Sequence, residues 1–310
     1  MLNFEFSELH PLSQGQLRAR QAEKGITFDA GFMHRGDEKL LEVRDFRQGL
    51  SLINRHNWLS PAAAEIAYAQ ACEELMGIAV SDKVIALREA LARLQEVTGL
   101  LQRLAGIFDD KAWLIIRETW VELTEQIAGA RLHVSAMRIG GTIVEIDETA
   151  VSRCRELSAS PLAAFTTDPW HGSGVLTKEN IAEFGITCVP EDTHDAAQRI
   201  DFAIARVREL ISQLPELFAQ ACSFSGTTEI TLPKVVRVPV GDSYQTQMGA
   251  TGRVGVWLFS DGGKSPLRLA LRSPSAIHLS AIESISHTLS FADVKALLTT
   301  VPLSLGEVDR

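Results

Sequence analysis

The chain has 310 residues, of which 45% are hydrophobic and 22% charged, and its formal net charge at pH 7 is −9. This length allows one large domain or two, and the acidic balance argues against a nucleic-acid surface, because phosphate binding needs concentrated Lys and Arg. The sequence predicts no transmembrane helix, since no run of about 18 apolar residues occurs, and its first residues lack the pattern of a signal peptide.

The cysteines are scattered and form no CxxC pair, which argues against a structural zinc site or a thiolate cluster. We expect buried, reduced thiols, as in a cytosolic protein. They are Cys72, Cys154, Cys188 and Cys222.

Residues 1–50 are expected to be irregular to extended. A helix is predicted over 61–76, because Ser60 suits the N-cap and Pro61 suits the first helical position. Gly77 then suits the end of this helix, where a left-handed conformation is common.

A second helix is predicted from about 83 to 107, where apolar residues recur at three- and four-residue steps and mark one buried stripe. A third is predicted over 113–133, before the glycine pair at 140–141. Residues 159–195 are rich in Ser, Thr, Pro and Gly and are expected to form a loop-rich insertion. Helical spacing returns over 200–211.

The spacing of hydrophobic residues changes from helical to alternating near the end of the chain. RVGVWLF and PLRLALR alternate apolar and polar residues on either side of SDGGKS, which predicts an antiparallel hairpin over 253–272. SFADVKALLTTV predicts one last short helix. The sequence contains no GxGxxG, Walker loop, GxSxG or HExxH, so the common nucleotide-binding and hydrolase functions have no support. The fold class predicted is α+β, mainly helical, in a single domain over 1–310.

Four sequence motifs that occur in a fixed order say more about the fold and function than the composition does. They are HRGDEKL (34–40), ARLHVSAMRIGG (130–141), VGVWLFSDGGKSPLRLALRSPSAIHL (254–279) and GEVDR (306–310). Together they resemble the D-type subunit of respiratory complex I (NADH:quinone oxidoreductase), a family related to the large subunits of nickel–iron hydrogenases. The resemblance covers most of the chain, which looks shorter than typical members, and it implies a helical core like that of the hydrogenase large subunit with a small antiparallel element.

The hydrogenase relatives hold their metal centre with two CxxC pairs, one before the helix at 61–76 and one at the C-terminus. Here NWLSPA and LGEVDR stand at those places without cysteine, so no metal site is predicted. In complex I the vacated cavity is the headgroup end of a quinone pocket. The resemblance implies that this chain binds no redox cofactor itself, that quinone is its ligand, and that an iron–sulfur small subunit is its partner.

The resemblance also assigns residues by position. Arg55 and His133 would face the terminal iron–sulfur cluster of the partner, where a cation or hydrogen-bond donor raises the cluster's potential. The alternatives for these two residues are an ordinary buried ion pair and a core histidine whose hydrogen bonds are satisfied.

The quinone cavity would be lined by His10, Gln14, Trp58 and His34, and two of these depart from the family. Gln14 replaces a histidine and has no titratable proton. Trp58 replaces a tyrosine; its indole keeps an N–H donor, but its bulk would fill part of the cavity. Both headgroup contacts are therefore altered together.

The remaining predictions concern charged side chains. Asp109 or Asp110 is a candidate for the acid that pairs with the headgroup histidine. Arg35 and Glu38 are expected to form a buried ion pair that shapes the loop around the cavity. The charged terminus is expected to tuck into the core as structural charges, through Glu307, Asp309 and Arg310.

The leading hypothesis is a protein like the D-type subunit of complex I, peripheral on the cytoplasmic face of the membrane and active only within its complex. It would frame an acceptor cavity beside the partner's cluster. One alternative is a degenerate large subunit of a hydrogenase-related, ion-pumping complex without a nickel–iron centre and without ordinary quinone chemistry. The other is a non-enzymatic scaffold or assembly protein.

Overall fold

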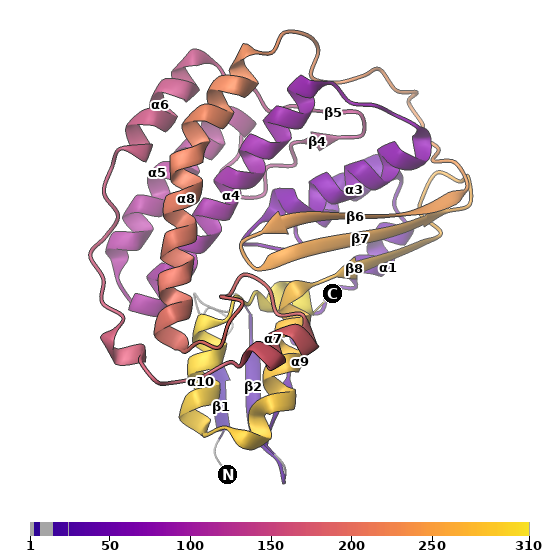
Figure 1. Cartoon of the computed structure of the whole chain (residues 1–310). Coiled ribbons are helices and arrows are strands. Elements are labelled where there is room, and N and C mark those ends of the chain that lie inside the picture. The colour runs from indigo at the N-terminus through magenta and orange to yellow at the C-terminus, as the bar shows by residue number, and fades with distance from the viewer. Residues whose placement is uncertain (1–2, 7–14, 24, 310) are drawn as a thin grey trace.

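A bundle of long helices forms the larger part of the computed structural model, which describes residues 3–6, 15–23 and 25–309 (Figure 1). Its helices are α3 (Pro61–Met76), α4 (Asp82–Phe108), α5 (Lys111–Ala128), α6 (Glu148–Ser158) and α8 (Ala196–Ser223). Helix α4 contacts α3, α5 and α8, and α6 packs on α8. The apolar stripe of α4 is buried in these contacts. The mainly helical prediction is thus confirmed.

A three-stranded antiparallel sheet covers α3 (Figure 1). Its strands in spatial order are β6 (Gly241–Gly249), β7 (Gly252–Ser260) and β8 (Arg268–Arg272). Strands β7 and β8 pair with Val256 opposite Leu271, which confirms the predicted hairpin. The sequence does not predict β6, because GDSYQTQMG lacks the apolar alternation of a half-buried strand.

Small residues let these layers approach α3 closely. A side chain on Gly99 of α4 would overlap the carbonyl oxygen of Leu59, and a Cβ on Gly249 of β6 would lie 2.8 Å from Cβ of Ser60. Helix α3 itself is rich in alanine and is buried on almost all sides of its first three turns. The start of α3 is therefore held rigidly between a helix and a sheet.

A second, smaller hydrophobic cluster forms where the first and last parts of the chain meet. Its elements are β2 (Leu17–Gln21), β3 (Ile26–Asp29), α7 (Lys178–Phe184), α9 (Pro274–Ile285) and α10 (Phe291–Thr300), and the backbone of β1 (Asn3–Phe6) pairs with β2. The three strands form an antiparallel sheet in chain order. The last turn, α11 (Leu305–Val308), contacts α9 and brings the C-terminal end beneath the sheet on α3 (Figure 1).

Short elements complete the fold. They are α1 (Asp37–Glu42), α2 (Phe46–Ile53), β4 (Met137–Arg138), β5 (Gly141–Thr142) and the 3-10 turns η1 (Asp168–Trp170) and η2 (Ser286–Thr288). Helix α1 packs on β8, and α2 packs on α3. Both helices therefore border the start of α3.

Three predictions need correction. Residues 1–50 were expected to be irregular to extended. The three strands in their described part agree with this expectation, but α1 and the first residues of α2 do not. The helix predicted over 113–133 ends at Ala128, where Gly129 takes a left-handed conformation with φ 74°. Loops dominate 159–195 as predicted, but α7 and η1 interrupt them. The single domain over 1–310 stays a prediction.

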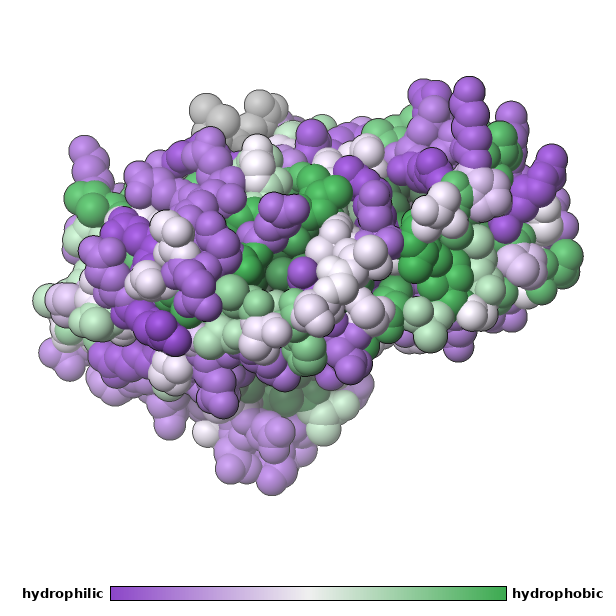
Figure 2. Space-filling view, turned by 90° about the horizontal axis from the view of Figure 1, so that it is seen from above, coloured by the Kyte–Doolittle hydropathy of each residue, from purple (hydrophilic) through white to green (hydrophobic). Residues whose placement is uncertain are grey.

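The thiols and the surface add two observations. Cys72 and Cys154 are buried, whereas Cys188 and Cys222 are only half-buried, so the burial predicted for all four is wrong for two. None of the described helices is long and apolar enough to cross a bilayer. Polar side chains cover much of the face in Figure 2, and hydrophobic ones show mainly in the hollows between them.

Candidate functional site at the start of helix α3

The turn into α3 is fixed by Asn57, whose side chain is fully buried. Its Oδ1 accepts hydrogen bonds from the backbone N–H groups of Leu59 and Ser60 at 3.0 and 3.1 Å. Its Nδ2 donates to Oγ1 of Thr251 at 3.0 Å and to the carboxylate of Glu307 at 2.7 Å. Three parts of the chain that are far apart in sequence therefore meet where α3 begins.

Arg55, Trp58 and His133 lie together beside this turn. The indole Nε1 of Trp58 donates to the carbonyl of Arg55 at 2.8 Å, and its ring meets that of His133 edge-on with centroids 6.4 Å apart. Nδ1 of His133 lies 3.0 Å from the carbonyl oxygen of Asn54. Burial and the positive charge of Arg55 lower the pKa of His133, so its ring is neutral near pH 7 and Nδ1 carries the proton.

Arg35 connects this group to the C-terminal end of the chain. Its guanidinium carbon lies 5.8 Å from the ring centre of Trp58, which is within the range of a cation–π contact. The same guanidinium donates to Oδ2 of Asp37 at 3.0 Å and to the carbonyl of Gly306 at 3.2 Å. The HRGDEKL and GEVDR motifs therefore contact each other directly.

The predicted ion pair between Arg35 and Glu38 is wrong. Arg35 pairs with Asp37, whereas Glu38 accepts a hydrogen bond from the backbone N–H of Leu271 at 2.9 Å and lies 3.5 Å from Nη2 of Arg268. Helix α1 begins at Asp37, so Glu38 projects in a different direction and ties the helix to β8.

The C-terminal carboxylates are buried but rely on neutral donors. Glu307 accepts hydrogen bonds from the backbone N–H of Ser275 at 3.1 Å and from its hydroxyl group. Asp309 accepts from the backbone N–H groups of Gly31 and Met33 at 2.6 and 2.8 Å. Among the described residues no cation lies at ion-pair distance from either carboxylate. Arg310 lies outside the described residues, so structural ion pairs of this terminus stay a prediction. Burial raises the pKa of Glu307.

His56 belongs to the same site, although no motif singles it out. Its side chain is fully buried, and neither ring nitrogen has a hydrogen-bond partner among the described residues. Nδ1 lies 3.6 Å from Oδ2 of Asp37. The only sequence signal for it is its place in the NRHNW segment, because its approach to Asp37 depends on the tertiary fold.

A hollow of about 150 Å³ opens beside Arg55. A cavity of roughly this size holds one small ring. His34 is exposed and, like Trp58, is not part of its wall. His10, Gln14 and Arg310 lie outside the described residues. The hollow is lined by Arg35, Asp37, Leu40, Leu41, Leu52 and Arg55.

The two candidate acids for the headgroup histidine have other roles. Asp110 is the N-cap of α5, where its Oδ1 accepts from the backbone N–H of Ala112 at 2.8 Å. Asp109 ends α4 in a left-handed conformation with φ 49°. Neither lines the hollow beside Arg55.

The nickel–iron centre of the hydrogenase relatives needs thiolate ligands, and no cysteine occurs in residues 54–60 or 305–310. The described part of the chain also contains no group of three or more His, Cys, Asp or Glu side chains suited to a metal ion.

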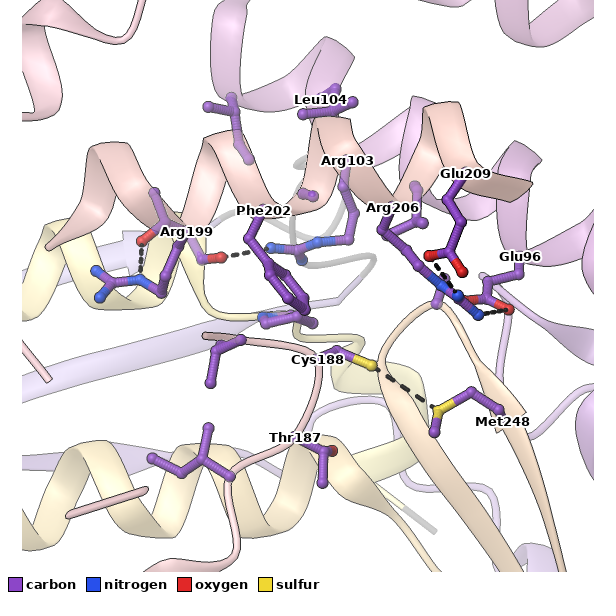
Figure 3. Close-up of a pocket in the computed structure, with 18 of the residues that line it drawn as sticks. Glu96, Arg103, Leu104, Thr187, Cys188, Arg199, Phe202, Arg206, Glu209 and Met248 are labelled. Atoms are coloured by element: carbon purple, nitrogen blue, oxygen red, sulfur yellow. Dashed lines mark hydrogen bonds and ion pairs between the residues drawn. The ribbon is translucent and has the colours of Figure 1, made fainter. Parts of the chain in front are cut away.

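A larger cavity, of about 590 Å³, lies between α4, α8 and the loop at 186–189 (Figure 3). Phe202 projects from α8 toward Cys188, whose Sγ lies 3.9 Å from Sδ of Met248. Arg103 lines it as well, but its guanidinium donates to the carbonyls at the end of α10, including Val301 at 2.9 Å. Apolar side chains form most of its wall, and no sequence pattern predicts it because the lining residues come from distant segments.

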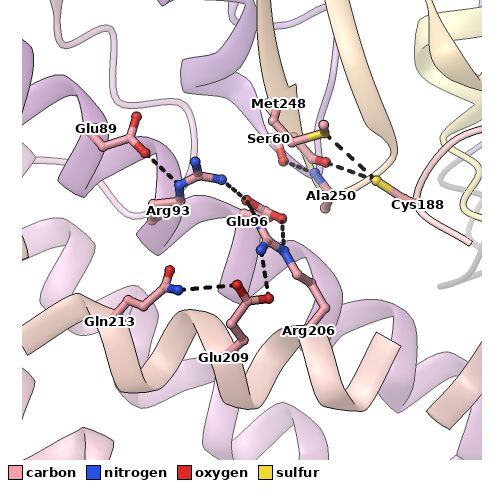
Figure 4. A network of polar contacts seen from close by, with 11 residues as sticks. Ser60, Glu89, Arg93, Glu96, Cys188, Arg206, Glu209, Gln213, Met248 and Ala250 are labelled. Atoms are coloured by element: carbon pink, nitrogen blue, oxygen red, sulfur yellow. Dashed lines mark hydrogen bonds and ion pairs between the residues drawn. The ribbon is translucent and has the colours of Figure 1, made fainter. Parts of the chain in front are cut away.

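Three charged groups of this cavity, Glu96, Arg206 and Glu209, form ion pairs within the protein (Figure 4). The buried carboxylate of Glu96 lies between Arg93 and Arg206, at 3.1 and 2.9 Å, and Arg206 also contacts Glu209 at 2.9 Å. Burial lowers the pKa of Arg199 to about 9, and its Nη1 has no hydrogen-bond partner among the described residues. Most of this network thus joins α4 to α8.

Comparisons with known proteins find similarity to the family that the four motifs resemble. Residues 201–310 match the family model described as the 49 Kd subunit of respiratory-chain NADH dehydrogenase. The chain is 28% identical to a D-type NADH-quinone oxidoreductase subunit of Salinispora arenicola, over 97% of this chain and 92% of that one. It is 27% identical to the D-type subunit of Geobacter metallireducens, over 97% and 96%.

Two further points concern length and fold. The alignment with the Salinispora protein runs over 356 positions, more than the 310 residues of this chain, as expected for a shortened relative. Among solved structures, a chain of the membrane-bound sulfane sulfur reductase, an archaeal respiratory membrane complex, superposes with a TM-score of 0.84 at 22% identity. The match covers 100% of this chain and 98% of that chain, so the two share their fold along their whole length.

Proposed function

The chain is a divergent relative of the D-type, 49 kDa subunit of NADH-quinone oxidoreductases, and from this premise we propose a peripheral subunit that frames an electron-acceptor site beside a partner's iron–sulfur cluster. Its relatives are subunits of an oxidoreductase complex, so the chain is enzymatic as part of an assembly. The observation that carries the proposal is the grouping of Arg55, Trp58 and His133 at the start of α3, next to a hollow.

The electrostatics of the group support a role beside a reducible cluster. Arg55 is exposed, and its Nη1 donates to Oδ1 of Asn54 at 2.9 Å, which holds its charge on the same side as His133. The neutral imidazole of His133 adds no second charge, and its one N–H, at Nδ1, is donated to the carbonyl of Asn54. A fixed cation near a cluster stabilises the added electron and raises the potential.

Exposed apolar side chains around the hollow support a docking surface for the iron–sulfur subunit. Leu40 and Leu52 line the hollow and are 40% and 36% exposed, and Val43 between them is 73% exposed. Phe32 adds a further 40%-exposed ring from the loop that Asp309 holds. Burying such side chains against a partner is favourable, whereas leaving them in water is not.

Location and cofactors follow from the same proposal. The chain lies on the cytoplasmic face of a membrane-bound complex and reaches the membrane only through its partners. It holds no redox cofactor of its own; the iron–sulfur cluster belongs to the small subunit, and a quinone is the acceptor. Oxidation of NADH in the assembly belongs to other subunits.

Redox titration of the partner's cluster in the purified complex tests this role. Arg55→Gln removes a positive charge, so we expect the potential of the cluster to fall. The fall is on the order of 50 mV, for a charge roughly 10 Å away at an effective dielectric constant of about 20 or somewhat above. The matched control is Arg153→Gln on α6, where the arginine pairs with Glu156. Equal potentials in the wild type and in Arg55→Gln would contradict the proposal.

A second candidate function keeps the assembly but discards ordinary quinone chemistry. The indole N–H of Trp58 is already bonded to the carbonyl of Arg55, so it is not available to a quinone carbonyl, and the hollow is small. Quinone binding by Trp58→Tyr and Gln14→His variants separates the two functions. Binding that appears only in the double variant favours the second function, whereas binding by the wild type favours the first.

A further inference from the structure

His56 occupies an unusual environment at the base of the candidate site. Its ring is 0% exposed and both of its nitrogens lack hydrogen-bond partners among the described residues. A buried polar group without partners is costly, so native proteins keep such groups where they have a role or a bound water. A packing residue of the same size would not need a titratable ring.

Two carboxylates act on this ring from different elements. Asp37, at the start of α1, places Oδ2 3.6 Å from Nδ1 of His56. Glu307, on α11, is fully buried, and among its described neighbours it accepts hydrogen bonds only from neutral donors. Burial raises the pKa of Glu307, and a positive charge on His56 would oppose that rise. The positive groups nearby are Arg35, which is paired with Asp37, and Arg55, which is exposed. The protonated ring would thus be balanced by buried negative charge.

The side chain of Asp37 is also accessible from the surface of the protein. It lines the hollow beside Arg55, and its side chain is 13% exposed, whereas His56 is sealed behind it. A proton on Nδ1 of His56 can reach the hollow through Oδ2 of Asp37 if the 3.6 Å gap contracts to a hydrogen bond, as acid–base pairs commonly do when the reactant is bound.

We propose that His56 is the proton-holding group of this site and that it exchanges its proton with the hollow through Asp37. The inference rests on the proposed function, in which a quinone receives two electrons from the partner's iron–sulfur cluster and takes up two protons to become a quinol. Gln14 and Trp58 carry no proton that titrates near neutral pH. His56 supplies one of the two protons through Asp37. Solvent at the hollow, which Asp37 reaches, supplies the second proton and reprotonates His56.

Carboxyl-carbon NMR of the full chain, labelled at Asp and Glu, tests the charge on His56 without any assay of activity. His56→Gln removes the cation, so we expect the pKa of Glu307 and the pKa of Asp37 both to rise, by about one unit. His287→Gln, at an exposed histidine on η2, is the matched control and should move neither. Unchanged values for both carboxyls in His56→Gln would overturn the proposal.

The route is tested by the pH profile of quinone reduction in the purified complex. His56→Gln and Asp37→Asn should each lower the rate about 100-fold, with the loss relieved as the pH falls and protons come directly from solvent. Full rates in a folded Asp37→Asn complex would overturn the route. A wild-type complex that reduces no quinone would instead contradict the proposed function, while the NMR result would still report on His56.

Discussion

His278 shows how a single buried side chain can set the acid limit of this protein. Its Nδ1 donates to the carbonyl of Pro302 at 2.8 Å, and its Nε2 accepts from the backbone N–H of Thr187 at 3.1 Å. Burial lowers its pKa to about 4 from the usual 6.5. Nδ1 can donate to Pro302 whether or not the ring is protonated, but Nε2 accepts from Thr187 only in the neutral ring, so protonation would break the contact with Thr187.

The sign of the pH effect follows from that lowered pKa. A histidine whose folded pKa is below its unfolded value contributes stability above pH 6.5 and loses it as the pH falls toward 4. Between about pH 7.5 and 5 this loss is about 2 kcal/mol of unfolding free energy. Gln can keep one donor and one acceptor at this position. We therefore expect His278→Gln to lose about 2 kcal/mol less unfolding free energy than the wild type between about pH 7.5 and 5, as measured by urea unfolding. The same pH dependence in both proteins would contradict the lowered pKa of His278.

At the residue scale, the sequence does not show which side chains contact one another. Arg55 and His133 both contact Asn54, and their position beside a partner's cluster stays a prediction. Arg35 pairs with Asp37 and not with Glu38, because the direction of each side chain is set by where α1 begins. His56 has no motif of its own, and only the fold shows that it is buried.

At the scale of elements, the position of α3 depends on how closely its neighbours approach. Gly99 of α4 lies against the backbone of Leu59, and a Cβ there would also sit 2.8 Å from Cβ of Ala250. Neither contact is the end of a flexible side chain, so the helix itself would have to move. The start of α3, and with it the candidate site, would shift.

We therefore expect Gly99→Ala to lower the unfolding free energy by about 1–3 kcal/mol despite the better helix propensity of alanine. Ile85→Ala changes an exposed residue of the same helix and should stay within about 0.5 kcal/mol. Thermal and urea unfolding measure both. A stabilised Gly99→Ala protein would mean that α4 and the turn before α3 are not in contact.

Helices and strands were predictable from the sequence where their hydrophobic residues follow one clear spacing. The long helices and the β7–β8 hairpin carry clear helical or alternating patterns, and capping residues marked several ends. Short elements such as α1, α2 and β6 were missed, because their packing against α3 and β8 stabilises them more than local pattern does.

At the scale of the whole molecule, the proposed docking surface consists of exposed apolar residues of α1 and α2. Val43, which ends α1, is 73% exposed, and Leu40 and Leu52 line the hollow. Val43→Lys should weaken binding of the partner at least about tenfold by placing a charge in the interface, with little change in the stability of the chain itself. Ile115→Lys on α5, at a 68%-exposed position, is the matched control.

The whole fold was predictable only through the order of four motifs. Composition and period specify a mainly helical chain but not which segments meet. The approach of the HRGDEKL segment to the C-terminal end, seen in the bond from Arg35 to Gly306, spans nearly the full chain and has no local signal. The cavity between α4 and α8 likewise arises from segments that no motif connects.

The most direct measurement is the polypeptide and iron content of the chain when it is purified, under mild detergent, from the cells that make it. The account predicts an iron–sulfur subunit bound in equal amount, with acid-labile sulfide, and its loss in Val43→Lys but not in Ile115→Lys. A chain that purifies alone, or with partners that carry no iron, would contradict the account.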